Sequence, residues 1–287
     1  MHFVEAAEPL VHWPLGEHLA VGLVEDEGDR FVPVTEARRA ATGLPADQAL
    51  ERARGNLADR SRARLSCVVA GLYASPWQDE HDAARLLLPE CVDRLPVCGE
   101  PVLMVPHRDH LLAAGADDPT ALAAMLELCR ALLEAPDFVS GVPLVRHGGG
   151  YTPFRPEPEH PLHGAFAELR VAQMVREHAQ QRGWLEARLG GQGLFVASLR
   201  GIETRSGLAS YCVWSRGAPS LLPRAELVAV LDPDEPGPPI VVRWDDVMAI
   251  AGDALVPLGD TYPPRYRTRA FPAASTLSAL RERNVDL

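Results

Sequence analysis

The chain contains no lysine, and all 28 of its basic residues are arginines. Pyridoxal phosphate enzymes and Schiff-base aldolases are therefore excluded, because both classes react through a lysine amine. A P-loop nucleotide site is excluded as well, since its lysine and the G-x-x-x-x-G-K-[ST] motif are missing. The same absence rules out a protein kinase, although His107, Arg108 and Asp109 spell the catalytic-loop triplet of that family.

Other signatures of cofactor binding and covalent catalysis are also missing. The Gly-rich segments 148–150 and 190–193 lack the G-x-G-x-x-G spacing of a dinucleotide site. The second segment is typical of a hairpin turn, and the first is compatible with a mobile loop over a cleft. No G-x-S-x-G motif occurs, and Cys212 lies in an apolar strand-like segment that favours burial over reactivity. The sequence therefore predicts no cofactor.

Cysteine content and charge limit the location and the partners. The five cysteines form no C-x-x-C pair and their number is odd, which is typical of a reducing cytoplasm. No basic and apolar leader opens the chain, and no apolar run approaches the roughly 20 residues of a membrane span. The net charge of -11 argues against a general nucleic-acid binder. We expect a cytoplasmic protein that binds neither membranes nor nucleic acid, with its oligomeric state left open.

Hydrophobic periodicity and turn residues predict helices and strands in irregular order. Helices are predicted at 35–43, 46–60, 79–88, 117–134, 162–182, 245–251 and 275–283. Strands are predicted at 65–73, 142–146, 184–189, 194–199, 208–214, 221–231 and 240–244, with hairpins at 19–34 and 101–115. Because this order lacks a regular βαβα alternation, the sequence predicts an α+β fold with mainly antiparallel sheets and packed helices.

Glycine and proline content suggests where the chain divides. Residues 141–164 read as a Gly/Pro-rich linker or loop between an N-terminal α+β unit, 1–140, and a C-terminal α+β unit, 165–287. A short internal similarity links LMVPHRDHLLAAGADDP in the first unit with SLLPRAELVAVLDPDEP in the second. This similarity raises the possibility that the two units are related.

The densest group of ionisable side chains next to an apolar segment is His107-Arg108-Asp109-His110. The two imidazoles and the carboxylate are suited to acid/base catalysis or to metal binding. In a strand and turn, however, His107 and His110 point to opposite faces, so no metal site is predicted. The structural alternative is that Asp109 accepts turn amides and Arg108 pairs with an acid elsewhere. A further acidic group, residues 79–82, is expected to open a helix, where carboxylates favour the helix dipole.

A second candidate site is built from arginines near the C-terminus. Arg265, Arg267 and Arg269 alternate along an extended segment, which places them on one face. Arginine binds carboxylates and phosphates in a bidentate manner, so this face is a candidate anion site, with internal pairing to acids as the alternative. Tyr151, beside the first Gly-rich segment, is the remaining candidate ligand-binding residue.

Several longer segments together resemble the uncharacterised YtpQ-like bacterial family. They are ALERARGNL (49–57), DAARLLLP (82–89) and GEPVLMVPHRDHLLAAG (99–115), with SYCVWS and LLPRAELVAV in the second half. The resemblance would cover most of the chain. It implies a soluble cytoplasmic bacterial protein, and it brings no established activity and no functional residue.

Two functions remain from these observations. The first is a binding or accessory protein that acts on a protein partner or on a small anionic ligand, since no complete catalytic constellation is visible. The alternative is an enzyme, a lyase, cyclase or hydrolase, that uses His107, Asp109 and His110 with or without a metal.

Overall fold

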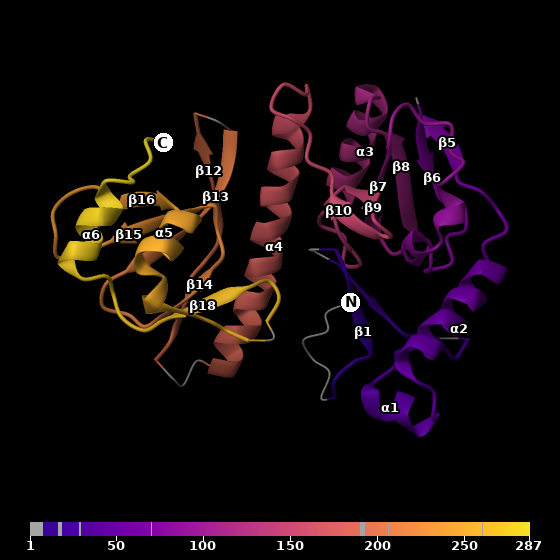
Figure 1. The fold of residues 1–287 in the computed structure, drawn as a ribbon, viewed down its shortest axis with the longest axis horizontal. Helices are drawn as coiled ribbons and strands as arrows, with labels where there is room; N and C mark the ends of the chain where they lie inside the picture. Colours follow the sequence, from indigo (N-terminus) through magenta and orange to yellow (C-terminus); the bar gives the residue numbers. More distant parts are fainter. Residues whose placement is uncertain are drawn as a thin grey trace. The chain divides into compact units, whose positions relative to one another are not determined.

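The computed structural model describes residues 8–16, 19–28, 30–69, 71–189, 193–205, 207–259 and 261–287. Helices pack against sheets whose strands are mostly antiparallel, so the predicted α+β fold is confirmed (Figure 1). The chain divides into two compact units, residues 1–166 and 167–287, and each has its own hydrophobic core. The division falls in the first turn of helix α4 (His163–Leu189).

The first unit is organised around an antiparallel sheet with the strand order β10-β9-β7-β8-β6-β5. Its strands are β5 (Ser66–Val69), β6 (Leu72–Ala74), β7 (Pro101–His107), β8 (His110–Gly115), β9 (Leu144–His147) and β10 (Gly150–Pro153). Helix α3 (Pro119–Leu132) packs against β6, β7 and β8, and the short 3-10 helix η2 (Ala83–Leu87) contacts β7 and β8. The interiors of β7 and β8 are fully buried, which confirms the predicted hairpin at 101–115.

Smaller elements complete the first unit. Strand β1 (His12–Leu15) pairs with β2 (Leu19–Gly22), and β3 (Val24–Asp26) pairs with β4 (Phe31–Pro33). Helix α1 (Glu36–Ala41) begins at Thr35, whose side chain accepts the Arg38 amide, and α2 (Ala46–Asp59) follows. Asp118 caps α3 in the same way. These predicted helix starts are confirmed.

The second unit contains two mixed sheets. One has the order β12-β13-β15-β16, formed by β12 (Arg200–Thr204), β13 (Gly207–Ser215), β15 (Leu227–Leu231) and β16 (Ile240–Arg243). The other has the order β11-β14-β18-β17, formed by β11 (Phe195–Val196), β14 (Ser220–Pro223), β18 (Arg265–Thr268) and β17 (Leu255–Pro257). Helices α5 (Trp244–Ala251) and α6 (Ala274–Arg281) contact each other and β16, around a core that includes Trp214 and Val242.

Three segments of the first unit differ from what the sequence led us to expect. The expected strand at 65–73 is the hairpin β5–β6, which turns at Gly71 with a φ of +83°. The expected helix at 79–88 is reduced to η2, because Gln78 and Glu80 have positive φ values and the preceding segment forms a loop. The expected linker at 141–164 contains β9 and β10, which extend the first sheet.

Helix α4 differs most from the sequence expectation in the second unit. It was predicted to end at Gly183 but continues to Leu189, so the expected strand at 184–189 is wrong. A glycine inside a helix costs about 1 kcal/mol relative to alanine, and packing of Leu185 against Val196 and Leu221 offsets that loss. The predicted turn at 190–193 lies outside the described residues except for Gly193.

The two segments that resemble each other in sequence have different topologies. The first forms the hairpin β7–β8 within one sheet, whereas the second contributes β14 to one sheet and β15 to another. The strand predicted at 221–231 is therefore two strands separated by residues 224–226. None of the helices in the described ranges combines the length and the apolar composition needed to cross a membrane.

Candidate functional site

The predicted corner at 107–110 is the turn between β7 and β8. The Asp109 carboxylate accepts the Glu80 amide at 2.8 Å. The Arg108 guanidinium lies 3.4 Å from the Glu80 carboxylate and 3.3 Å from that of Asp137. Asp109 and Arg108 therefore make the contacts that the structural alternative predicts.

The two histidines of the corner are neighbours across the hairpin. Their ring centroids are 5.7 Å apart with an edge-on arrangement. Nδ1 of His107 lies 3.2 Å from the Asp109 amide, from which it can accept, and 3.5 Å from the Asp109 carboxylate, to which it can donate. Nδ1 of His110 is buried and has no partner in the described chain. Burial, and next the charge of His107, lower the pKa of His110, so His110 is neutral at neutral pH.

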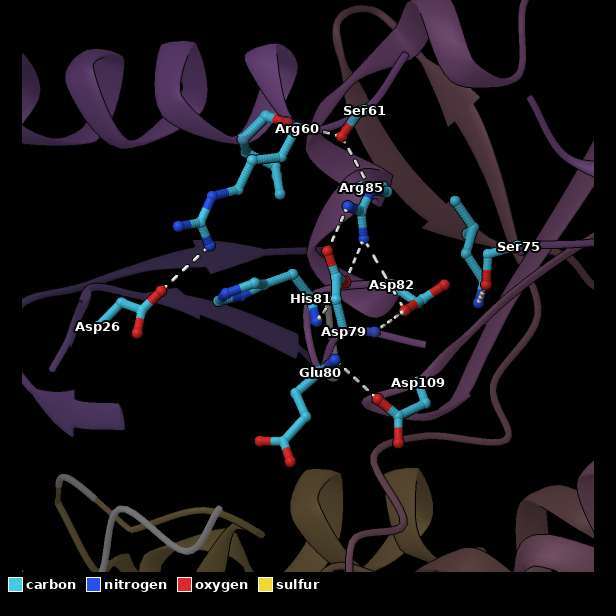
Figure 2. Close-up of polar contacts among 12 residues, drawn as sticks. Asp26, Arg60, Ser61, Ser75, Asp79, Glu80, His81, Asp82, Arg85 and Asp109 are labelled. Atoms are coloured by element: carbon cyan, nitrogen blue, oxygen red, sulfur yellow. Dashed lines mark hydrogen bonds and ion pairs between the residues drawn. The ribbon is translucent and has the colours of Figure 1, made fainter. Parts of the chain in front are cut away.

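A charged network lies next to this corner, and sequence reasoning missed it (Figure 2). Arg85 is fully buried, and its two Nη atoms each donate to an oxygen of Asp79 at 2.7 Å. Its Nε donates to the Ser61 hydroxyl at 2.8 Å, and its guanidinium stacks 4.1 Å from the centre of the Trp77 ring. Asp82, also fully buried, lies 3.8 Å from Arg85. The acidic group at 79–82 thus binds a buried arginine instead of opening a helix.

Carboxylates outnumber the arginine in this network. The hydrogen bonds from Arg85 lower the pKa of Asp79 to about 2, so Asp79 is ionised at neutral pH. One oxygen of Asp82 accepts the Asp79 amide, while its buried Oδ1 has no partner in the described chain. The charge of Arg85 is thus matched within the network. Asp79 and Arg85 are only six residues apart in the sequence, but nothing in the sequence indicated that they form a buried pair.

The predicted ligand-binding residues fall in different units. Tyr151 belongs to the first unit, where it is buried and donates its hydroxyl to the Leu86 carbonyl at 2.6 Å. Arg265 and Arg267 both lie on β18 in the second unit. Arg267 is exposed, but Arg265 is fully buried, because helix α4 and the segment after β11 cover it.

Every hydrogen-bond partner of Arg265 in the described chain is neutral. Nε donates to the Gln181 side chain at 2.6 Å, and Nη1 donates to the carbonyls of Ala197 and Leu221 at 2.7 and 3.1 Å. Nη2 donates to the His178 carbonyl at 3.2 Å. Burial lowers the pKa of Arg265 to about 10, which still leaves the guanidinium charged at neutral pH. A positive charge is therefore buried without a bonded carboxylate.

A pocket of about 370 Å³ lies between α4 and the start of β12. We call it the α4 pocket. Its lining residues are His178, Ala179, Arg182, Gly183, Glu186, Ser198, Leu199 and Arg200. Arg265 is bonded to the backbone of His178 and of Ala197, the residue before Ser198, so the buried charge adjoins the lining of this pocket.

Side chains of the α4 pocket are partly ordered by contacts with each other. Arg182 donates through Nε to Glu186 at 2.7 Å and through Nη1 to the Ser198 hydroxyl at 2.6 Å. Arg200 is exposed and forms no ion pair with the described residues. The lining therefore carries two arginines and one carboxylate, in a chain whose net charge is -11.

His178 gives the α4 pocket a neutral imidazole. It is 2% exposed, and its Nδ1 is buried with no partner in the described chain. Burial, followed by the charge of Arg265, lowers the pKa of His178 to about 3. His178, Arg182 and Glu186 follow at helical i,i+4 spacing, a signal that the sequence contained but that the expected helix end at Gly183 interrupted.

Comparisons of the chain with family models, curated proteins and solved structures found no match. Roles for its residues therefore come from geometry and chemistry. Among the residues that the structure describes, histidine, cysteine and acidic side chains nowhere gather in threes in a way that could hold a metal ion.

Proposed function

We propose that the protein binds a small anionic ligand in the α4 pocket. The observation that carries this proposal is the guanidinium of Arg265, which is buried next to the pocket without a bonded carboxylate. Removing an ion from water is costly, and dipoles of carbonyl groups compensate only part of that loss. A bound anion would provide the missing negative charge.

The rest of the pocket suits such a ligand. Arg182 and Arg200 offer guanidinium donors, which match the geometry of carboxylate and phosphate oxygens. The contacts of Arg182 with Glu186 and Ser198 hold its side chain in place, so little further ordering is needed on binding. A volume of about 370 Å³ is at the small end of ligand sites, which favours a metabolite-sized anion over a macromolecule.

His178 would contribute selectivity to this site. Its low pKa keeps the imidazole neutral, so His178 offers a hydrogen bond without adding charge. Because His178 lines the pocket, a ligand with a hydroxyl or carbonyl group beside its anionic group would meet this neutral ring. We therefore favour a hydroxy acid, a keto acid or a small phosphate ester over a simple inorganic anion.

Thermal unfolding in the presence of anions tests the proposal. Inorganic phosphate and succinate should raise the melting temperature in a saturable manner, whereas chloride at equal ionic strength should not. Arg200→Gln should raise the Kd of the anion about tenfold, because it removes a charge-assisted contact. The matched control is Arg267→Gln, an exposed arginine on β18. Loss of anion binding in Arg267→Gln but not in Arg200→Gln would place the ligand elsewhere and refute the proposal.

The rival function is an enzyme that acts through the corner at 107–110. The observation in its favour is the unpartnered Nδ1 of neutral His110, which could act as a general base. Burial of that atom and the engagement of Arg108 and Asp109 in internal contacts count against it. A screen with chromogenic esters and phosphate monoesters would decide. The enzyme would be the better proposal if the chain turned over such a substrate, if His110→Ala abolished this turnover, and if His147→Ala, which changes an exposed histidine, did not.

A further inference from the structure

Strand β5 is an edge strand of the first sheet, and its side chains are exposed on both faces of the sheet. It is the outermost strand in the order β10-β9-β7-β8-β6-β5 (Figure 1). All its residues, Ser66–Val69, are exposed, and Val68 and Val69 retain 56% and 52% of their accessible surface. An exposed edge of this kind presents unpaired backbone amides and carbonyls together with apolar side chains.

The opposite edge of the same sheet is protected, which makes β5 unusual within its own unit. Strand β10 ends in Pro153 and buries Tyr151. Strand β5 contains neither proline nor a charged residue, the devices that commonly block strand addition. Its inner side pairs with β6 through a bulge between Cys67 and Val69, and no described residue forms a backbone hydrogen bond to its outer side.

The chain that leads into β5 carries a local positive charge. Residues 60–69, RSRARLSCVV, include three arginines and no acidic residue, although the whole chain has a net charge of -11. Arg60 pairs with Asp26 at 3.1 Å. Arg62 and Arg64 are exposed, and neither forms an ion pair in the described part of the chain. Two uncompensated arginines therefore precede an open apolar edge.

We propose that β5 is the docking strand for an extended, acidic segment of a partner protein. The segment would add a strand to the sheet through main-chain hydrogen bonds, and its apolar side chains would cover Val68 and Val69. Its carboxylates would lie near Arg62 and Arg64, and these two positive charges favour a negatively charged partner. This surface belongs to the first unit and shares no residue with the α4 pocket, so it is independent of the anion site.

Binding of short synthetic peptides to the full-length chain tests this surface. The probe is a capped, fluorescein-labelled peptide that alternates glutamate and valine, and the control peptide replaces each glutamate with arginine. Fluorescence anisotropy should show saturable binding of the acidic peptide alone. Bound peptide should also slow amide hydrogen exchange in residues 66–69, which anchors the signal to β5.

Surface variants make the test specific. Val68→Lys and the double variant Arg62→Glu/Arg64→Glu should each weaken acidic-peptide binding about tenfold. Because all three side chains are exposed, the fold should tolerate these changes, and an unchanged melting temperature verifies it. Arg94→Glu, an exposed arginine elsewhere in the first unit, should bind like the wild type.

Three results would overturn the proposal. The first is equal binding of both peptides. The second is binding of the acidic peptide that none of the β5 variants reduces. The third is a stable dimer, seen by light scattering, that Val68→Lys dissociates, because the occupant of the edge would then be a second copy of this chain.

Discussion

Among the described residues, each unit of the molecule contains one fully buried arginine, and the two are satisfied in different ways. Arg85 in the first unit donates to both oxygens of Asp79, lies near buried Asp82 and stacks on Trp77. Arg265 in the second unit donates to three backbone carbonyls and one amide side chain. Hydrogen bonding is good in both cases, but only the first charge is neutralised within the described chain.

This difference separates a structural role from a binding role. Carboxylates of its own unit match the charge of Arg85, so we infer that this network has a structural role and links Ser61, the loop at 79–82 and η2. Arg265 also joins distant segments, since its partners lie on α4, after β11 and on β14. Its uncompensated charge beside the α4 pocket is what distinguishes it, and we infer from this that it attracts an anion.

The largest effect is expected for Arg85→Met. The variant leaves the ionised Asp79 and the buried Asp82 without their cation, and breaking a buried pair in this way costs about 3–5 kcal/mol. Urea unfolding should report a loss of this size in the free energy of unfolding. A loss below that of Arg265→Met would mean that charge pairing does not distinguish the two arginines.

A smaller loss is expected for Arg265→Met, about 1–3 kcal/mol, because the variant removes unbalanced buried charge together with hydrogen bonds to neutral groups. The same variant should abolish stabilisation by phosphate, while Arg85→Met should retain it. Urea unfolding with and without phosphate measures both quantities. Equal phosphate stabilisation in Arg265→Met and the wild type would contradict the binding role.

A comparable effect concerns the pH dependence of the second unit. Because the pKa of His178 is about 3 in the folded chain and near 6.5 when unfolded, the unfolded state binds more protons between these values. Above pH 6.5, His178 therefore does not change the free energy of unfolding. As the pH falls from 6.5 to 5, His178 lowers the free energy of unfolding by about 2 kcal/mol.

Amide hydrogen exchange in β15 follows this unit separately from the first. His178→Phe should flatten the dependence on pH, and His147→Gln, which changes an exposed histidine of the first unit, should leave it unchanged. An equally steep loss of protection in His178→Phe would show that another group causes it.

Local signals in the sequence predicted much of the fold but little of the sites. The caps Thr35 and Asp118 and the apolar runs of the β7–β8 hairpin were read correctly, because each depends on neighbouring residues. The buried arginines were not, because their surroundings are assembled by tertiary contacts. Arg265 meets Gln181, which is 84 residues away in the chain, and alternation along β18 could not reveal that α4 covers it.

The α4 pocket was missed for a related reason. Gly183 and the apolar residues after it resembled the end of a helix and the start of a strand. Packing of Leu185 with Val196 and Leu221 instead keeps the helix intact, and so aligns His178, Arg182 and Glu186 along one wall. The loop at 79–82 was misread because its carboxylates serve Arg85, a partner whose burial no local pattern indicates.

Anomalous diffraction from crystals grown with sodium selenate would test the central claim most directly, because selenate matches phosphate in shape and selenium can be located without ambiguity. The account predicts selenium in the α4 pocket, bound by Arg182 and Arg200 beside His178, with its occupancy reduced by added phosphate. Selenate bound only at other surfaces, with the α4 pocket free of it at saturating concentration, would contradict the account.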